Sequence, residues 1–315
     1  MGDPRADLAR SKGERTGSRW PSRTRAAGRD AASGPGAPLQ QNETPDPRLL
    51  SAWGEETASI LEHVRVGPDW YTLALHAPLL AAAARPGQFA QVCVHDPDLP
   101  VTTAPLLRRP LSICTVAEAE GRVSFIYRVV GLGTALLAGR QVGGRLGLLG
   151  PLGRSFPDPV RHPGRPLLLL GGGLGIPPLA FAASWARAAG RPTEAVLGAR
   201  SAAYLAGAAE VAATGVPVLA VTEDGSAGRT GRITTVLGER LAPGVEVWAC
   251  GPGPMLTAIR DLCAAAGADC WLCLERPMAC GFGVCIGCAV ARSDGQGYLK
   301  ACVDGPVFPA AAVEP

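Results

Sequence analysis

Four cysteines near the carboxyl end of the 315-residue chain have the spacing of a metal-binding loop. Cys280, Cys285 and Cys288 form a C-x4-C-x2-C pattern, and Cys302 follows after a short interval. This spacing is typical of plant-type [2Fe–2S] clusters, whereas zinc ribbons favour paired C-x2-C knuckles. Glycines between the cysteines let the backbone turn tightly and direct N–H groups at sulfur. The pattern favours an iron–sulfur site and leaves structural zinc as the alternative.

Three further cysteines lie just before this group. Cys270 and Cys273 form a C-x-x-C in a strand-like run, where residues three apart face opposite sides and cannot easily share a metal. Cys263 lies on one face of a predicted helix. We interpret these three thiols as buried packing residues.

A glycine-rich turn follows the predicted buried strand 167–170 and precedes a predicted helix that begins at Pro177 or Pro178. Such a turn lets the backbone approach a pyrophosphate, whose charge a helix N-terminus stabilises. The strict G-x-G-x-x-G pattern fails at Ile176, so a tight βα turn without a ligand remains open. Another strand-to-helix turn is predicted at the same sheet edge. The candidate nucleotide-binding residues of the two turns are Gly171, Gly172, Gly173, Gly175, Cys250, Gly251 and Pro252.

The first half of the chain offers cationic and hydroxyl groups among few other charges. Arg109 and Arg128 can pair with phosphate oxygens, and Ser112 and Thr134 can donate hydrogen bonds to a ring or phosphate. The alternative is that these arginines are ordinary solvated surface residues. We find no arrangement of acid, base and nucleophile, because the four histidines are scattered, and we predict no catalytic residues.

The elements that must position these groups change in character along the chain. Short apolar runs at 58–66, 70–75, 87–94, 111–116, 123–130 and 145–149 predict an antiparallel β-barrel, with one helix at 133–138. Strands at 167–170, 195–197, 218–221, 245–250 and 269–275 alternate with helices at 178–189, 202–213, 234–239 and 254–266. This alternation predicts a doubly wound parallel sheet. We expect a mixed β and α/β chain with a barrel domain (55–160), a nucleotide-binding domain (161–268) and an iron–sulfur segment (269–315).

Charge separates residues 1–50 from the rest. They contain 9 of the 30 basic and 6 of the 27 acidic residues, so the remainder is balanced and offers no electrostatic footprint for nucleic acid. Their polar composition predicts a disordered extension over residues 1–54, or an over-extended start. The absence of a signal sequence or apolar span predicts a cytoplasmic protein that does not enter the membrane. In the cytoplasm, clustered cysteines are metal ligands more often than they form disulfides.

Several motifs in order make the chain resemble the ferredoxin–NADP reductase superfamily. They are Pro-Gly-Gln-Phe (86–89), Arg-Pro-Leu-Ser (109–112), Gly-Thr (133–134), the 171–178 loop and Cys-Gly-Pro-Gly-Pro-Met (250–255). The ending is more specific, because residues 275–288 and 301–308 resemble electron-transfer subunits of B-type dihydroorotate dehydrogenases. The resemblance covers residues 56–315.

The resemblance implies a cofactor for each part of the chain. It implies NAD on the α/β domain and a [2Fe–2S] cluster on Cys280, Cys285, Cys288 and Cys302. Arg200, near the end of the second strand, leaves the choice of NAD over NADP less secure, because an arginine there could meet a 2′-phosphate. The resemblance also implies FAD on the barrel, at Arg109, Pro110, Leu111, Ser112, Ile126, Tyr127, Arg128, Gly133 and Thr134.

The family implies a function in pyrimidine (UMP) biosynthesis. An FMN-containing catalytic subunit oxidises dihydroorotate, and this chain passes the electrons through the cluster and FAD to NAD⁺, in a heterotetramer with two copies of each subunit. Three alternatives remain. One is a small flavin/iron–sulfur subunit of another reductase, such as an NADH-dependent ferredoxin–NADP oxidoreductase. The others are a zinc-stabilised binding module and a flavin reductase with purely structural cysteines.

Overall fold

The computed structural model describes residues 53–97 and 105–315. The predicted disordered extension therefore lies outside the described residues, except for Trp53 and Gly54. Among the helices of the described ranges, none combines the length and apolar character needed to cross a membrane.

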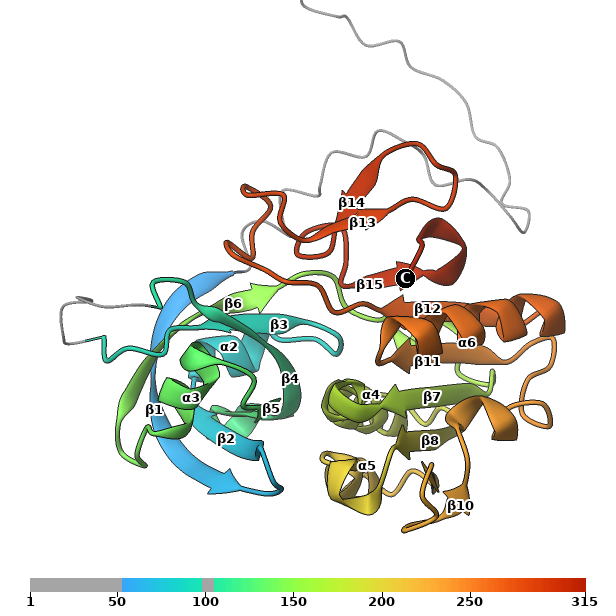
Figure 1. The fold of residues 1–315 in the computed structure, drawn as a ribbon, viewed down its shortest axis with the longest axis horizontal. Helices are drawn as coiled ribbons and strands as arrows, with labels where there is room; N and C mark the ends of the chain where they lie inside the picture. The colour runs from blue at the N-terminus through green and yellow to red at the C-terminus, as the bar shows by residue number, and fades with distance from the viewer. Residues whose placement is uncertain (1–52, 98–104) are drawn as a thin grey trace, which may run out of the picture. The chain divides into compact units, whose positions relative to one another are not determined.

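The first part of the described chain is a closed antiparallel barrel with the strand order β1-β2-β5-β4-β3-β6 (Figure 1). Ala90 and Val92 of β3 point into its apolar interior, together with Ile113 of β4 and Phe125 of β5. The predicted barrel is thus confirmed. Its strands are β1 (Gly54–Arg65), β2 (Trp70–His76), β3 (Phe89–Val92), β4 (Arg109–Ala117), β5 (Arg122–Arg128) and β6 (Arg145–Leu152).

Two short helices accompany the barrel. Helix α3 (Leu132–Ala138) confirms the predicted helix after β5. Helix α2 (Pro78–Ala83) was not predicted; it begins at a proline, which suits a first helical turn because no N–H is needed there. Its six residues are too few to show a helical period in the sequence.

The second part is a seven-stranded sheet with the order β10-β9-β8-β7-β11-β12-β15 (Figure 1). Six strands pair in parallel, which confirms the predicted α/β fold, and β15 adds an antiparallel edge. The strands are β7 (Leu167–Gly172), β8 (Thr193–Ala199), β9 (Val218–Thr222), β10 (Arg229–Thr230), β11 (Glu246–Cys250), β12 (Asp269–Cys273) and β15 (Val307–Pro309).

Alternate residues of the central strand β7 face two separate cores. Leu167 and Leu169 pack with α4 (Pro177–Ala188) and α5 (Ala208–Ala213). Leu168 and Leu170 pack with α6 (Gly253–Ala266) and the 3-10 helix η5 (Ile233–Val236). A strand buried on both faces explains the uninterrupted leucine run in the sequence.

Two predicted helices are shorter than expected. The helix predicted over 202–213 divides into the 3-10 helix η4 (Ala202–Tyr204) and α5, because Gly207 has a positive φ of 95°. The helix predicted over 234–239 is the single 3-10 turn η5. Neither segment has the length needed for a stable isolated helix, so tertiary packing sets its bounds.

The carboxyl-terminal segment returns to the sheet after the cysteine loop. Strands β13 (Ala289–Ala291) and β14 (Tyr298–Lys300) form a hairpin, and β15 then pairs with β12. The strand predicted over 269–275 ends at Cys273. Residues 274–306, which contain the cysteine loop and the hairpin, thereby lie between two strands that pair with each other, β12 and β15.

Candidate functional site

The cysteine loop connects β12 to β13 and contains Cys280, Cys285 and Cys288, while Cys302 follows β14; the four thiols lie in two pairs. The Cys285 N–H donates to Cys280 Sγ at 3.5 Å, and the thiols of Cys280 and Cys285 interact. Cys288 Sγ and Cys302 Sγ lie 3.2 Å apart and are buried. Within residues 53–97 and 105–315, no three His, Cys, Asp or Glu side chains converge as one ion would need. Two thiol pairs match the two iron atoms of a [2Fe–2S] cluster, each of which is held by two thiolates.

The loop backbone prepares one of these thiols for metal binding. Burial opposes ionisation of Cys280, but N–H groups of Cys285, Phe282 and Val284 outweigh it and lower its pKa to about 6. Burial and the nearby Cys288 raise the pKa of Cys302 to about 12. Since thiolates are the ligands, binding a metal here must release the proton of Cys302.

The positive φ angles of the loop explain its glycines. Gly281 and Gly283 have φ values of 84° and 90°. Ile286, between Cys285 and Cys288, has a φ of 60° and is the one non-glycine residue of the described chain with a positive φ. A β-branched residue is strained there, so the loop keeps an exposed isoleucine at a cost in stability.

The two predicted nucleotide loops meet at the carboxyl edge of the sheet. Gly171 of β7 pairs with Cys250 of β11. A Cβ atom at Gly172 would lie 2.5 Å from Met255 Sδ, and one at Gly175 would lie 2.1 Å from the Cys250 carbonyl oxygen. The two loops therefore approach each other so closely that only glycine fits at these positions.

Helices α4 and α6 begin at these loops, and neither has an acidic residue in its first turn. Pro177 opens α4, as predicted. Both helix starts thus meet the same edge with no acidic residue in their own first turns, although α4 has no N–H donors at its first two positions, Pro177 and Pro178. This arrangement can bind the negative charge of a pyrophosphate.

On the barrel, Arg109 lies directly against the start of α3. A Cβ atom at Gly133 would lie 2.0 Å from Arg109 Nε and 2.4 Å from its Cζ, so the guanidinium needs glycine there. The Thr134 hydroxyl accepts hydrogen bonds from the N–H groups of Val130 and Gly131. Its role in this structure is to hold the turn, and the predicted bond to a cofactor stays a prediction.

The other predicted barrel residues share strands β4 and β5. Ser112 pairs with Phe89 across β3 and β4, and Pro110 pairs with Gln91. Ile126 and Tyr127 are buried, and the Tyr127 hydroxyl bonds His63 Nε2 at 2.8 Å, so this side chain belongs to the barrel interior. Any contact of Tyr127 with a cofactor must therefore involve its backbone.

Arg128 lies near a residue that the sequence analysis missed. Its guanidinium is 5.9 Å from the ring centroid of Tyr204, and the guanidinium of Arg200 is 3.6 Å from the same centroid. Arg128 also pairs with Asp69 at 3.6 Å. A lone tyrosine in a short 3-10 turn gives no sequence signal for such a contact.

The remaining cysteines are buried or half-buried, as predicted for Cys263, Cys270 and Cys273. Cys270 packs on the α6 side of the sheet and Cys273 on the α4 side, which confirms that they face opposite ways. Cys250 is buried beside Cys273, its partner across β11 and β12. Its thiol faces the core, so nucleotide contacts at this position fall to the backbone.

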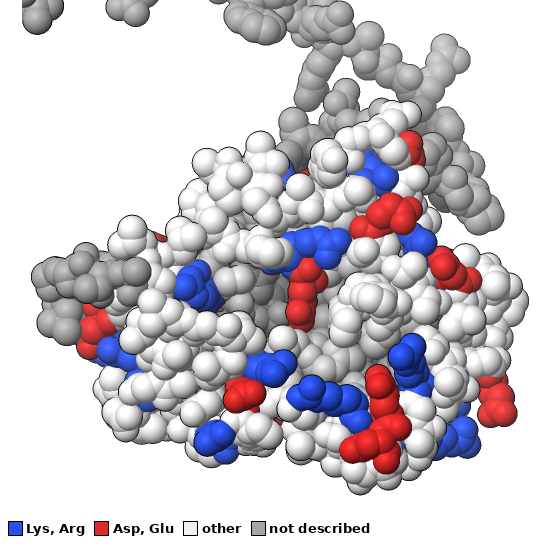
Figure 2. Space-filling view, viewed as in Figure 1, with Lys and Arg blue, Asp and Glu red and all other residues white. Residues whose placement is uncertain are grey.

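Charged groups of both signs are interspersed on the mostly uncharged face shown in Figure 2. The cysteine loop instead presents apolar side chains to solvent: Phe282 is 44% exposed, Val284 73% and Ile286 63%. The Phe282 ring stacks on the Trp53 ring, with the two ring centroids 6.2 Å apart. A solvent-facing apolar loop of this kind is suited to contact with another protein.

Comparison with known proteins agrees with this geometry. A family model described as the iron–sulfur cluster binding domain of dihydroorotate dehydrogenase B matches residues 275–314. The chain is 38% identical over 261 residues to the dihydroorotate dehydrogenase B (NAD(+)) electron transfer subunit of Geobacillus thermodenitrificans, covering 82% of this chain and 98% of that protein. It is 39% identical over 244 residues to the protein of that name from Bacillus velezensis, covering 77% and 92%.

Solved structures share the fold. A chain of an NADH-dependent reduced ferredoxin-NADP oxidoreductase superposes with a TM-score of 0.70 at 31% identity, covering 81% of this chain and 89% of that chain. A ferredoxin NADP⁺ reductase from Neisseria gonorrhoeae, with bound FAD and NADP, superposes with a TM-score of 0.56 at 20% identity, covering 68% and 92%. The second likeness shows the fold alone.

Proposed function

The chain belongs to the family of dihydroorotate dehydrogenase B electron transfer subunits, and we propose that it passes electrons from a dihydroorotate-oxidising catalytic subunit to NAD⁺. Its cofactors are FAD, a [2Fe–2S] cluster and NAD. When bound, the cluster supplies single-electron exchange, and the flavin links it to the two-electron chemistry of the nicotinamide. The protein's own part is to hold these groups and exclude competing reactions.

The observation that carries the proposal is the paired arrangement of four thiols, three from one glycine-containing loop and Cys302 from the residues after β14. Cys280 and Cys285 would hold one iron, and Cys288 and Cys302 the other. The lowered pKa of Cys280 supports a thiolate ligand at neutral pH. The burial of Cys288 and Cys302 supports a site that excludes water on one side.

FAD would bind along β4, the end of β5 and the start of α3. Arg109 and Arg128 would pair with its phosphate oxygens, and Gly133 allows Arg109 to lie against the helix. The backbone of Ile126 and Tyr127, whose side chains are buried, would contact the cofactor edge. The residues proposed for FAD are Arg109, Pro110, Leu111, Ser112, Ile126, Tyr127, Arg128, Gly133 and Thr134.

NAD would bind at the carboxyl edge of the sheet, where the two glycine loops and two helix starts meet. Arg200, which could have met a 2′-phosphate, is stacked on Tyr204. Asp224 lies beside it, and its hydrogen bonds with Ser226 lower its pKa. A fixed carboxylate disfavours a 2′-phosphate, which supports NAD over NADP.

The exposed apolar residues of the cysteine loop would contact the catalytic subunit. This places the cluster next to the partner, as electron transfer between subunits requires. We propose that the partner carries FMN, that two copies of each chain form a heterotetramer, and that the complex acts in the cytoplasm in pyrimidine biosynthesis. Nucleic acid is not an expected partner, since the charge of residues 51–315 is balanced.

A second candidate function follows from the likeness to the NADH-dependent reduced ferredoxin-NADP oxidoreductase at 31% identity. In that case the chain would serve a different catalytic partner with the same cofactors. The 38–39% identity to relatives named for dihydroorotate dehydrogenase B favours the first function.

The test is an anaerobic preparation of the full chain with its co-purifying partner, assayed for iron, sulfide, flavins and NAD⁺ reduction by dihydroorotate. We expect two irons, two sulfides and one FAD per chain. Cys285→Ser should abolish the cluster absorption and retain FAD, while Cys263→Ser, at a packing position, should retain both. A colourless protein with one zinc would overturn the proposal, and a partner inactive on dihydroorotate would favour the second function.

A further inference from the structure

Gln91 is a fully buried amide side chain without a hydrogen-bond partner in the described chain. It lies in β3 and is 0% exposed, and neither its Oε1 nor its Nε2 is paired within residues 53–97 and 105–315. Burying an amide unpaired is unfavourable, and native proteins rarely do so without a functional reason. The barrel alone gives no reason for a glutamine at this position.

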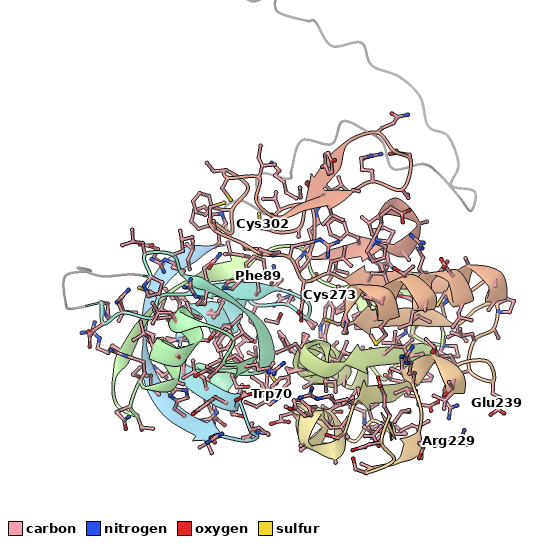
Figure 3. All side chains as sticks on the ribbon, viewed as in Figure 1. Trp70, Phe89, Arg229, Glu239, Cys273 and Cys302 are labelled. Carbon is pink, nitrogen blue, oxygen red and sulfur yellow. The ribbon has the colours of Figure 1, made fainter. Side chains whose placement is uncertain are left out.

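The alternation of β3 places Gln91 on the outer face of the barrel. Ala90 and Val92 point into the barrel core, so Phe89 and Gln91 point outward. Phe89 packs in the apolar cluster that contains Cys288 and Cys302; Phe89 and Cys302 are both labelled in Figure 3. The outer face of β3 is therefore covered by the cysteine segment.

The Gln91 amide lies against the residue that follows the first cysteine of the loop. A Cβ atom at Gly281 would lie 2.7 Å from both Cγ and Nε2 of Gln91. Any larger residue at Gly281 would push the amide away, so the loop and the glutamine fit each other. The contact joins the barrel to the backbone next to Cys280.

Gln91 also lies next to the residues proposed to bind FAD, because its strand β3 pairs with β4. Gln91 is opposite Pro110, and Val92 is opposite Arg109, in the β3–β4 ladder. A polar group at this position lies between the strand proposed to hold FAD and the loop proposed to hold the cluster.

We infer that Gln91 donates an N–H hydrogen bond to the sulfur atoms of the cluster held by Cys280, Cys285, Cys288 and Cys302, and so sets its reduction potential. The inference rests on the proposed function. Sulfur ligands accept hydrogen bonds, and such bonds are one of the factors that set cluster potentials. A reduced cluster carries one more negative charge, so a donor stabilises it and raises the potential. Gln91 is thus a positioning residue for electron transfer.

The test is a redox titration of the FAD- and cluster-loaded full chain, followed by electron paramagnetic resonance. Gln91→Met keeps the side-chain size and removes the donor. We expect the equilibrium constant for reduction of the cluster to fall about tenfold, which corresponds to a reduction potential about 59 mV lower for one electron. A proton coupling that is lost on exchange into D₂O should also disappear from the cluster spectrum.

Gln88→Met is the matched control. The Gln88 amide donates to the Gly153 carbonyl at 2.7 Å and accepts from the Arg85 N–H at 2.8 Å, so both its groups are used within the barrel. This variant should lower the thermal midpoint and leave the cluster potential unchanged.

An unchanged potential and an unchanged proton coupling in loaded Gln91→Met would overturn the inference. If that variant does not load a cluster, Gln91→Asn is titrated instead: its shorter amide should also lower the potential, and a wild-type potential there would overturn the inference. A wild-type chain without a cluster would refute the proposed function instead, so the two failures are distinguishable.

Discussion

Substituting alanine for Gly175 should separate the two loops proposed to bind NAD. The new Cβ atom would lie 2.1 Å from the Cys250 carbonyl oxygen, 2.2 Å from its carbonyl carbon and 2.4 Å from the Gly251 nitrogen. Real Cβ contacts do not come below 3.0 Å, so the loops must move apart by roughly 1 Å. Cys250 belongs to β11, which β7 and β12 hold on both sides, and so it cannot yield freely.

The expected magnitude follows from this displacement. Overpacking of a rigid site costs about 1–3 kcal/mol of stability. A misplacement of about 1 Å can lower a reaction rate by about 10²-fold. We therefore expect Gly175→Ala to lower the second-order rate constant of flavin reduction by NADH about 10²-fold, measured by anaerobic stopped flow. The FAD and iron contents should stay at wild-type values, because the barrel and the cysteine loop are untouched.

Gly190→Ala is the control, just after α4 and away from the proposed NAD edge. Gly190 has a φ of 69°, and a Cβ atom there would meet no heavy atom within 4 Å. Alanine at this position costs about 1–2 kcal/mol in backbone strain but displaces nothing. A wild-type rate for Gly175→Ala, or an equal loss for Gly190→Ala, would refute the close approach of the loops as the reason for glycine.

Two further predictions concern stability and partner binding. Glu246→Ala removes the carboxylate that lies 2.9 Å from the buried Arg191 guanidinium. Chemical denaturation should show that the free energy of unfolding falls by about 3–5 kcal/mol. For Glu194→Ala, in a half-exposed pair, it should fall by less than about 1 kcal/mol. Equal losses would contradict this reasoning. Val284→Ser with Ile286→Ser should weaken binding of the catalytic subunit by at least about tenfold in calorimetry, because two exposed apolar side chains would be buried in the complex. Val142→Ser, at an exposed turn remote in sequence, should not change the affinity. An unchanged affinity of the double variant would show that the partner binds elsewhere.

The elements predicted best are those in which burial determines the order of apolar and polar residues along the sequence. The leucine run of β7 and the closely spaced short apolar runs of the barrel predicted the fold, because strands that follow one another through turns and strands that alternate with helices leave different patterns. Helix α2 and β15 were missed and η5 was predicted as a longer helix, because none of these short segments has a periodic pattern that identifies it. Their conformations depend on contacts with distant parts of the chain, which a local pattern does not contain.

The candidate site divides in the same way. The cysteines and glycines were predictable because spacing and residue type carry their chemistry. Gln91 and Tyr204 were missed, since each is a single residue of ordinary type whose position depends on the fold. Thr134 and Tyr127 stay predicted cofactor contacts; the contribution of their side chains to the turn before α3 and to the barrel interior could not be read from the sequence.

The two ends of the sheet strands have different roles, which the distribution of charge explains. Arg165, Arg191, Glu246 and Asp269 form a network of ion pairs at the amino ends of β7, β11 and β12, and the Trp248 indole N–H donates to Glu246 as well. The carboxyl ends of β7 and β11 carry glycines and two helix starts without acidic residues. These ion pairs tie the amino ends of neighbouring strands together, and β7, β11 and β12 stay in register up to the residues from which the loops begin. The two helix starts at the binding edge can therefore lack acidic first turns and still keep the loop backbones within contact distance.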